Sequence, residues 1–124
     1  MLWLINIIMP IRSNGYKIPD CVTRAITTAT GLSYYDVANM LHYNGKIFQC
    51  DELSVVCYEH LLDYDLDFIH YKGYGKSVEE IANDFKNHIL LIRINGHLTV
   101  SMYGTIYDLF DCTKEIATDF WIVK

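Results

Sequence analysis

The apolar residues in the first part of the chain recur with a helical period. Four of them, between positions 22 and 29, stand at i, i+3, i+4 and i+7, which predicts a helix over residues 21–30 with one face toward a core. Asp20 is placed to cap the start of this helix, and Gly31 is placed to end it. This helix therefore begins at a cysteine, Cys21.

Two further helices are expected before residue 65. Ser33, with Asp36 three residues later, resembles a capping box and predicts a second helix that runs to a turn at Asn44-Gly45. A third helix is predicted over residues 51–63, with apolar positions along one side. The first half of the chain is thus read as helical.

The hydrophobic pattern of the second half of the chain indicates mainly strands. DFIHY predicts a short strand, and Ser77 with Glu80 forms a capping box for a helix over residues 77–87. Four runs rich in β-branched and aromatic residues follow, namely HILLIRI, HLTVSMY, TIYDLF and TDFWIVK. Asn95-Gly96 and Gly104 are placed to turn successive antiparallel strands. The order of elements predicts an α+β fold.

The opening segment LWLINIIMP is apolar, and we interpret it as an edge strand that ends at Pro10. It is too short to span a bilayer, has no basic residue before it and lacks a small-residue cleavage site, so no membrane association is expected. The turn formers in residues 10–19 predict an irregular loop. The chain, at 124 residues, is expected to form a single domain over 1–124.

Composition narrows the class of protein. Apolar residues make up 52% of the chain and charged residues 20%, which favours a folded core over disorder. The net charge of -5 comes from 15 acidic and 10 basic residues, and the basic ones are scattered along the sequence. Because nucleic-acid binding depends on clustered Lys and Arg, we expect no nucleic-acid partner.

The chain has four cysteines, Cys21, Cys50, Cys57 and Cys112, and no two of them form a C-x-x-C pair. This spacing excludes the usual zinc-ribbon and thioredoxin motifs, so no metal site and no cofactor are expected. Nothing in the sequence suggests an oxidising compartment, and reduced thiols in a cytoplasm are expected. Cys50, Cys57 and Cys112 are interpreted as unreactive residues that pack in the core.

Cys21 has the position of a nucleophile. A thiol reacts as its thiolate, and both a helix N-terminus and a nearby imidazolium lower its pKa. His97 opens a predicted strand directly after the Asn95-Gly96 turn, and Asp108 lies eleven residues later, across the turn at Gly104. Asp108 is the favoured acid beside His97, with Asp111 as the alternative, and such an acid would orient the imidazole and favour its protonated form.

Two segments resemble a known superfamily. DCVTRAITTATGLSYYDVANML is similar to the nucleophile helix and the following helix of papain-like cysteine peptidases, above all the bacteriocin-processing double-glycine peptidases and small phage-encoded papain-like proteins. INGHLTVSMYGTIYDLFD resembles their histidine strand and the strand that ends in Asp or Asn. The resemblance implies a papain-like fold, in which N-terminal helices pack on a C-terminal antiparallel sheet. It also implies that Phe110 takes the place of the tryptophan that shields the histidine pair.

The sequence departs from the family pattern at two positions. The family usually has a glutamine about six residues before the nucleophile, which completes an oxyanion hole, and Gly15 stands at that position. Asn14 is the candidate oxyanion donor in its place. Many double-glycine peptidases also have Gly directly after the cysteine, where this chain has Val22.

The function expected from these residues is acyl transfer on a peptide or isopeptide bond, with Cys21 as nucleophile, His97 as base and Asp108 as orienting acid. Amidase, transglutaminase-like or deconjugating chemistry on the same residues stays open. The substrate class is a peptide or protein, in the cytoplasm, or in the host cytoplasm for a phage protein. The alternative is a catalytically inactive papain-like fold that serves as a phage or bacterial protein-binding module, and a bare scaffold is the third reading.

Overall fold

The computed structural model describes residues 2–4 and 20–124. Its helices are α1 (Cys21–Thr30), α2 (Tyr34–Phe48), α3 (Val55–His60), the π-helical segment η1 (Leu61–Asp65) and α4 (Val78–Asp84). Its strands are β1 (Leu2–Leu4), β2 (Ile69–Lys72), β3 (Ile89–Ile94), β4 (His97–Met102), β5 (Thr105–Tyr107) and β6 (Asp119–Ile122). In the described part of the chain, no helix is both long and apolar enough to cross a membrane.

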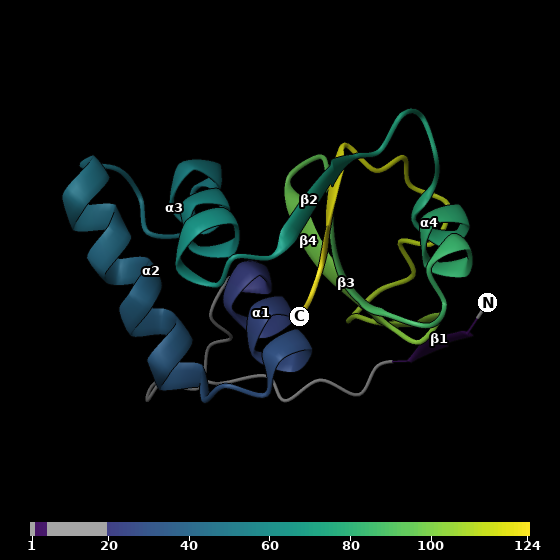
Figure 1. Cartoon of the computed structure of the whole chain (residues 1–124), viewed down its shortest axis with the longest axis horizontal. Coiled ribbons are helices and arrows are strands. Elements are labelled where there is room, and N and C mark those ends of the chain that lie inside the picture. Colours follow the sequence, from purple (N-terminus) through teal and green to yellow (C-terminus); the bar gives the residue numbers. More distant parts are fainter. Residues whose placement is uncertain (1, 5–19) are drawn as a thin grey trace.

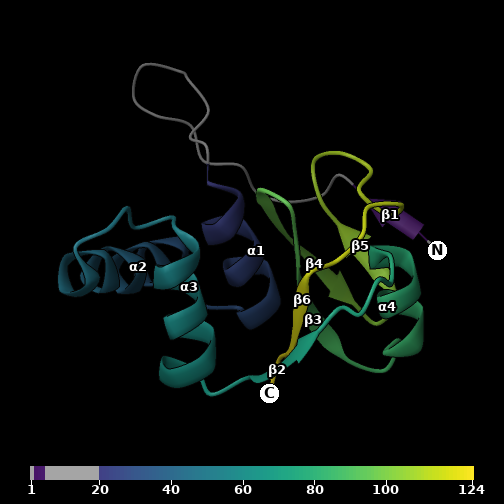
Figure 2. The same cartoon turned by 90° about the horizontal axis from the view of Figure 1, so that it is seen from above.

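The strands form one sheet with the order β1-β5-β4-β3-β6-β2. Neighbouring strands are antiparallel, except that β1 runs parallel to β5 at the edge. Helices α1, α2 and α3 lie on one side of the sheet, with α1 next to it, and α4 lies on the other side (Figures 1 and 2). The predicted α+β class is confirmed, with one parallel edge strand in a sheet that was expected to be antiparallel.

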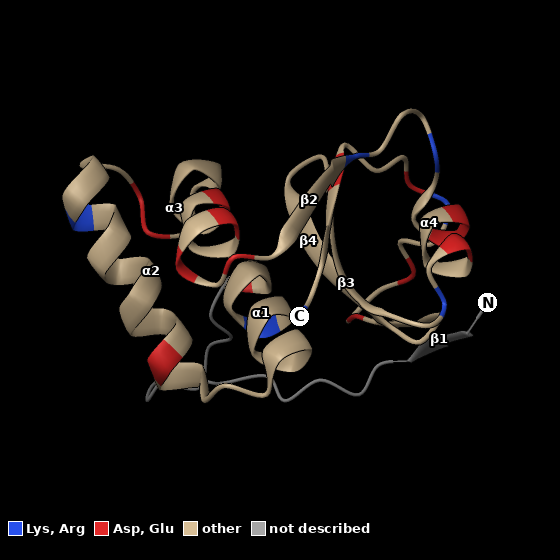
Figure 3. Ribbon diagram, in the orientation of Figure 1, with Lys and Arg blue, Asp and Glu red and all other residues tan. Residues whose placement is uncertain are grey.

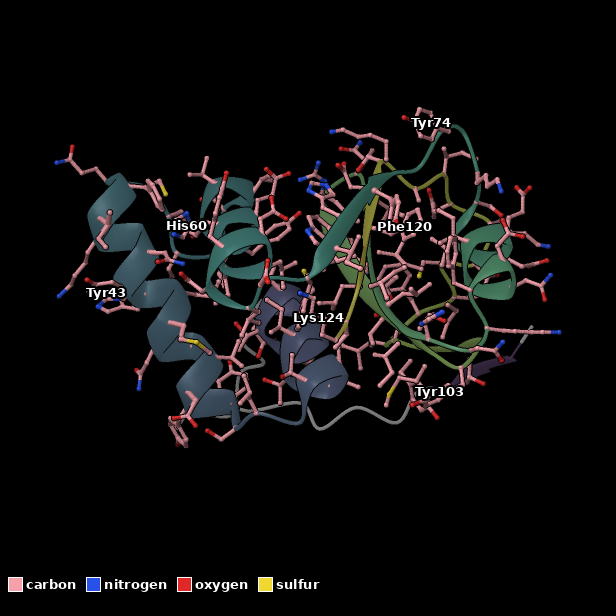
Figure 4. The ribbon with its side chains drawn as sticks, viewed as in Figure 1. Tyr43, His60, Tyr74, Tyr103, Phe120 and Lys124 are labelled. Atoms are coloured by element: carbon pink, nitrogen blue, oxygen red, sulfur yellow. The ribbon has the colours of Figure 1, made fainter. Side chains whose placement is uncertain are left out.

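Each face of the sheet has its own apolar core. The core on the α1 side contains the stripe of α1 together with Leu91, Val100 and Trp121 from the strands. The core on the α4 side is built around Phe120, which Figure 4 shows between the sheet and α4. Because alternate residues of a strand point to opposite faces, Phe120 and Trp121 belong to different cores.

Helix α1 has the bounds that its period predicted. Gly31 ends it in the left-handed conformation, at φ 75°, and its N–H donates to the carbonyl oxygen of Thr27 at 3.0 Å. Asp20 occupies the N-cap position, but its side chain does not cap the helix. The carboxylate instead forms an ion pair with Arg24 and accepts a hydrogen bond from the Tyr34 hydroxyl at 2.7 Å. The expected capping role of Asp20 was therefore wrong.

Helix α2 is longer than predicted, because Asn44-Gly45 lies within it and forms no turn. The helix continues to Phe48 and ends at Gln49, which has a positive φ of 54°. A Cβ atom on Gly45 would lie 3.1 Å from the carbonyl oxygen of Cys50, so a side chain here would require the following segment to shift by a few tenths of an ångström. Packing against the later segment overrides the turn propensity of Asn44-Gly45, and the local sequence gives no sign of that packing.

Helix α3 and helix α4 are shorter than expected. The first begins at Val55, after Ser54 at its N-cap, and gives way to the π-helical segment at Leu61. Val56, one of the apolar residues of the predicted helix, is 53% exposed. Helix α4 has the predicted capping box, in which the Ser77 side chain and the Glu80 side chain each bind the other's backbone N–H, but it ends at Asp84.

The two predicted hairpins are confirmed. Asn95-Gly96 joins β3 to β4, with Ile94 paired to His97, and Tyr103-Gly104 joins β4 to β5. Both glycines have positive φ, as a two-residue hairpin turn requires. Strand β5 ends at Tyr107, so Asp108 lies just after the strand, whereas the predicted strand TIYDLF has it in the middle.

The predicted N-terminal edge strand is present over Leu2–Leu4, where β1 pairs with β5. The rest of that prediction, up to Pro10, and the irregular loop over residues 10–19 lie outside the described residues. The first segment of the chain thus reaches the same edge of the sheet as the segment that carries Asp108.

A buried ionic network joins α3 to the sheet. The Asp119 side chain, 2% exposed, accepts hydrogen bonds from His70 at 2.7 Å and Lys72 at 3.0 Å and pairs with Arg93. Arg93 also pairs with Glu59 of α3. Burial alone would raise the pKa of Asp119, but the three cationic or hydrogen-bonding partners hold it well below its usual range. The network fixes Arg93, whose side chain faces the cavity described below.

Replacing Asp119 with Asn should lower the free energy of unfolding by about 3 kcal/mol, because it removes the buried carboxylate that His70, Lys72 and Arg93 share. The measurement is urea denaturation at pH 7. Since the folded pKa is depressed, this stabilisation is present above pH 3.8 and is lost as the pH falls through the folded pKa.

The matched control is Asp67→Asn, which removes the exposed ion pair with Lys124. That substitution should change the free energy of unfolding by less than about 1 kcal/mol. Equal losses for the two variants would contradict a special role for the Asp119 network.

Candidate active site

Cys21 is the first residue of α1, and the helix packs along β4. Its thiol is partly buried and lies beside His97, the first residue of that strand. The positive end of the α1 dipole favours a negative charge at this position. The structure therefore brings together a thiol and an imidazole that are separated by most of the sequence.

The β4–β5 hairpin brings Asp108 to His97. Val100 pairs with Tyr107, so continuing that register places Asp108 opposite Thr99, diagonally across from His97. The Nε2 atom of His97 lies 2.6 Å from Oδ2 of Asp108, and the two side chains are 11% and 4% exposed. This contact leaves Nδ1 as the ring nitrogen available to the Cys21 sulfur.

His97 shifts the pKa values of Cys21 and Asp108, and both of them shift that of His97. Burial alone would lower the pKa of His97, but the hydrogen bond to Asp108 and the contact with Cys21 raise it to about 9. Burial alone would raise the pKa of Cys21, but His97, the backbone of Leu98 and the charge of Arg24 lower it on balance. Each charge thus favours the other, since the imidazolium of His97 stabilises a thiolate at Cys21 and a thiolate stabilises the imidazolium.

Asp108 is held by more than His97. Its Oδ1 accepts a hydrogen bond from the backbone N–H of Leu109 at 2.7 Å, and the Cys112 thiol donates to Oδ2 at 3.7 Å. Burial would raise the pKa of Asp108, but the hydrogen bond with His97, the charge of that imidazole, the nearby Thr99 hydroxyl and the backbone N–H of Leu109 lower it on balance. Burial also raises the pKa of Cys112 to about 12, so its thiol keeps the proton that it donates.

Sequence reasoning missed two residues of this environment. Cys112 was interpreted as inert packing, whereas its sulfur contacts the Asp108 carboxylate. Thr99 was not considered, although it stands two residues after His97 on the same strand. Because residues i and i+2 of a strand share a face, that spacing was a usable signal for Thr99. The contact of Cys112 depends on the loop after β5, for which no local signal was available.

The remaining predicted site residues lie in three different places. Phe110 packs against His97 with ring centroids 4.8 Å apart, in the position expected for a shield. Asp111 is exposed, and its carboxylate accepts hydrogen bonds from the backbone N–H and hydroxyl of Thr113, so the structure does not place it beside the imidazole. Asn14, the oxyanion candidate, lies outside the described residues.

The acid that precedes the thiol is neutralised locally. Asp20 is 1% exposed, and a bare carboxylate there would oppose a thiolate on the next residue. Its ion pair with Arg24 and its hydrogen bond from Tyr34 satisfy both carboxylate oxygens. Arg24 then remains as a nearby positive charge that helps to lower the pKa of Cys21.

A cavity of about 230 Å³ opens beside Cys21 and His97. Segments from α1, the start of α3 and the β3–β4 turn form its walls, lined by Val22, Leu53, Ser54, Val55, Tyr58, Arg93, Ile94 and Gly96. Most of these side chains are apolar, and Arg93 already binds two carboxylates. The arrangement can hold an apolar side chain next to a nucleophile and a proton carrier.

A single group of possible metal ligands occurs among the described residues, formed by Glu59, His70 and Asp119 with ligand atoms within 4.8 Å of one another. Arg93 and Lys72 already pair with its most buried carboxylate. A metal ion there would lie against two fixed positive charges, so the group is better understood as an ionic network. Figure 3 shows acidic residues on several elements, with Lys and Arg spread among them.

Comparisons with known proteins do not place the chain in a family. No family model matches the chain, and neither the curated proteins nor the solved structures contain a match. The residues of this site are therefore the basis on which a function can be inferred for the chain.

The imidazole of His97 should titrate with a pKa near 9 in the folded protein, as measured by NMR of its ring protons across pH 5–10. Replacing Asp108 with Asn should bring that pKa down toward 6.5, because it removes the paired negative charge. Since the folded pKa is raised, the stabilisation is complete below pH 6.5 and is lost as the pH rises through 9.

Asp111→Asn is the matched control for this titration, since it makes the same chemical change three residues away on an exposed side chain. It should leave the His97 titration unchanged. A His97 pKa near 6.5 in the unmodified protein would contradict the proposed charge arrangement.

Proposed function

We propose that this chain is a papain-like cysteine hydrolase that cleaves a peptide or isopeptide bond by acyl transfer. The observation that supports the proposal most strongly is that His97 lies between the Cys21 thiol and the buried Asp108 carboxylate, at the wall of a cavity. A nucleophile, a base and an orienting group in hydrogen-bonding sequence are what covalent catalysis requires. The shield position of Phe110 agrees with the same proposal.

In the proposed reaction the Cys21 thiolate attacks the carbonyl carbon of the scissile bond and forms a sulfur–carbon bond. The imidazolium of His97 gives its proton to the nitrogen of the leaving amine as the carbon–nitrogen bond breaks. Asp108 holds the ring so that Nδ1 faces the sulfur. A water molecule, deprotonated by His97, then attacks the thioester, and the thiolate leaves with the carboxylic acid product released.

The cavity favours a peptide or protein substrate with an apolar side chain beside the scissile bond, since Leu53, Val55 and Ile94 line it. The backbone N–H of Cys21, at the start of α1, is the donor that we assign to the developing oxyanion. The chemistry needs a reduced thiol at Cys21, which fits a reducing compartment such as a cytoplasm.

Cys21 should react with iodoacetamide at pH 6, where an ordinary thiol with a pKa near 8.5 reacts slowly. Peptide mapping after timed labelling measures the rate at each cysteine. Cys21→Ala should abolish the rapid labelling, and His97→Ala should shift it to higher pH because the positive partner is lost. Slow labelling of all four thiols, rising only above about pH 8, would remove the basis for the catalytic proposal.

Hydrolysis of a library of peptide amides tests turnover directly. Cys21→Ala should remove activity, and His97→Ala should lower kcat by about 10²- to 10⁴-fold because general acid–base catalysis is lost. Asp108→Asn should reduce kcat, and Asp111→Asn, the same change on an exposed side chain, should not. Reactive Cys21 without turnover on any amide would instead favour a protein-binding module that retains the pair.

A further inference from the structure

Cys50 and Cys57 lie side by side at the corner between α2 and α3, with their sulfur atoms 3.1 Å apart. The corner is a hydrogen-bonded turn and not a loose loop. The N–H of Cys50 donates to the carbonyl oxygen of Gly45 at 3.0 Å, and the N–H of Ser54 donates to that of Asp51 at 3.0 Å. The contact between the two sulfurs is therefore built into the local backbone.

The two sulfurs have different surroundings. Cys50 is partly exposed, and its sulfur accepts a hydrogen bond from the Ser54 hydroxyl at 3.3 Å. Cys57 is fully buried, and its thiol donates to the carbonyl oxygen of Asp51 at 3.3 Å. Burial and the neighbouring sulfur raise the pKa of Cys57. A reagent from solution thus meets Cys50 first.

We propose that Cys50 and Cys57 form a redox-reactive thiol pair that accepts a small-molecule disulfide of the glutathione disulfide class and closes to an intramolecular disulfide. Cys50 is the attacking thiol, and Cys57 is the resolving thiol. A disulfide bond measures about 2.05 Å between sulfurs, so the two atoms must approach by about 1 Å to close it.

The chemistry is two successive thiol–disulfide exchanges. The Cys50 thiolate attacks one sulfur of glutathione disulfide, forms a mixed disulfide and releases one glutathione thiolate. The Cys57 thiol loses its proton and attacks the Cys50 sulfur, which forms the protein disulfide and releases the second glutathione. The protein loses two electrons and two protons, and one glutathione disulfide becomes two glutathione thiols.

Closing the pair would restrain one wall of the cavity. The ring from Cys50 to Cys57 contains Leu53, Ser54 and Val55, which face the cavity that Cys21 and His97 line. Ser54 is also the N-cap of α3 and a hydrogen-bond donor to the Cys50 sulfur. A role in controlling substrate entry rests on the proposed function, whereas formation of the disulfide does not.

The test uses the full chain carrying Cys21→Ala, which removes the reactive thiol of the proposed site. After treatment with glutathione disulfide, intact-mass analysis and peptide mapping should find a protein lighter by two hydrogen atoms, with the peptides of Cys50 and Cys57 cross-linked. Cys112, buried and with a raised pKa, is the internal control and should stay reduced. No reaction, or modification of Cys112 at the same rate, would overturn the proposal.

Two further substitutions in the same background separate the roles of the thiols. Cys57→Ser should stop the reaction at the mixed disulfide and leave one glutathionyl group on Cys50. Cys50→Ser should leave Cys57 unmodified, because that thiol is buried. If Cys57→Ser does not fold, Cys57→Ala serves in its place and should also stop the reaction at the mixed disulfide. A reactive Cys57 in the absence of Cys50 would overturn the assigned order.

Hydrogen exchange tests the effect on the cavity wall. In the oxidised Cys21→Ala protein, amide hydrogens of residues 53–58 should exchange at least about tenfold more slowly than in the reduced protein, whereas those of α4 should not change. Equal exchange rates of these amides in the oxidised and reduced proteins would contradict the proposal that the disulfide restrains the cavity wall. Because Cys21 is absent, these outcomes do not depend on whether the proposed hydrolase activity exists.

Discussion

The packing of α1 along β4 sets the direction in which the Cys21 sulfur points. The four buried apolar residues of the helix, Val22, Ala25, Ile26 and Ala29, belong to the core that also contains residues of the sheet. Cys21 stands four residues before Ala25 and so lies at the end of the same stripe. Because each helical residue turns by about 100°, a slip of one position would turn the thiol away from His97. The apolar core therefore positions the candidate nucleophile.

Sequence patterns predicted the fold best where a local signal and the tertiary structure agree. Gly31 ends α1, and Asn95-Gly96 turns β3 into β4, because each conformation is set by the residues themselves. Asn44-Gly45 was misread, since its environment is set by Cys50 and Glu52, which pack against Gly45 from a segment that follows. The helix over 51–63 failed for a similar reason, because its first residues form the hydrogen-bonded corner instead.

The site could be predicted to the extent that one hairpin register determines it. The turn at Gly104 fixes the pairing of β4 with β5, and that pairing brings Asp108, and not Asp111, to His97. The contact between Cys21 and His97 required the arrangement of a helix on a sheet, which local patterns do not encode. The order of elements was read from periodicity, and the resemblance to papain-like proteins agreed with pairing these two residues. The neutralisation of Asp20 by Arg24 was not foreseen, because a cap was the simpler expectation for an acid at a helix start.

The four cysteines show how strongly the environment, and not the residue type, decides chemistry. Cys21 has an imidazolium and a helix N-terminus beside it, which favour its thiolate. Cys112 is buried against the Asp108 carboxylate, which favours its protonated form and makes it a donor. Cys50 and Cys57 share one hydrogen-bonded corner, in which Cys50 is partly exposed and Cys57 is buried. A single oxidant or alkylating agent therefore meets four thiols in different surroundings, and the differences in their reaction rates report on the packing around each.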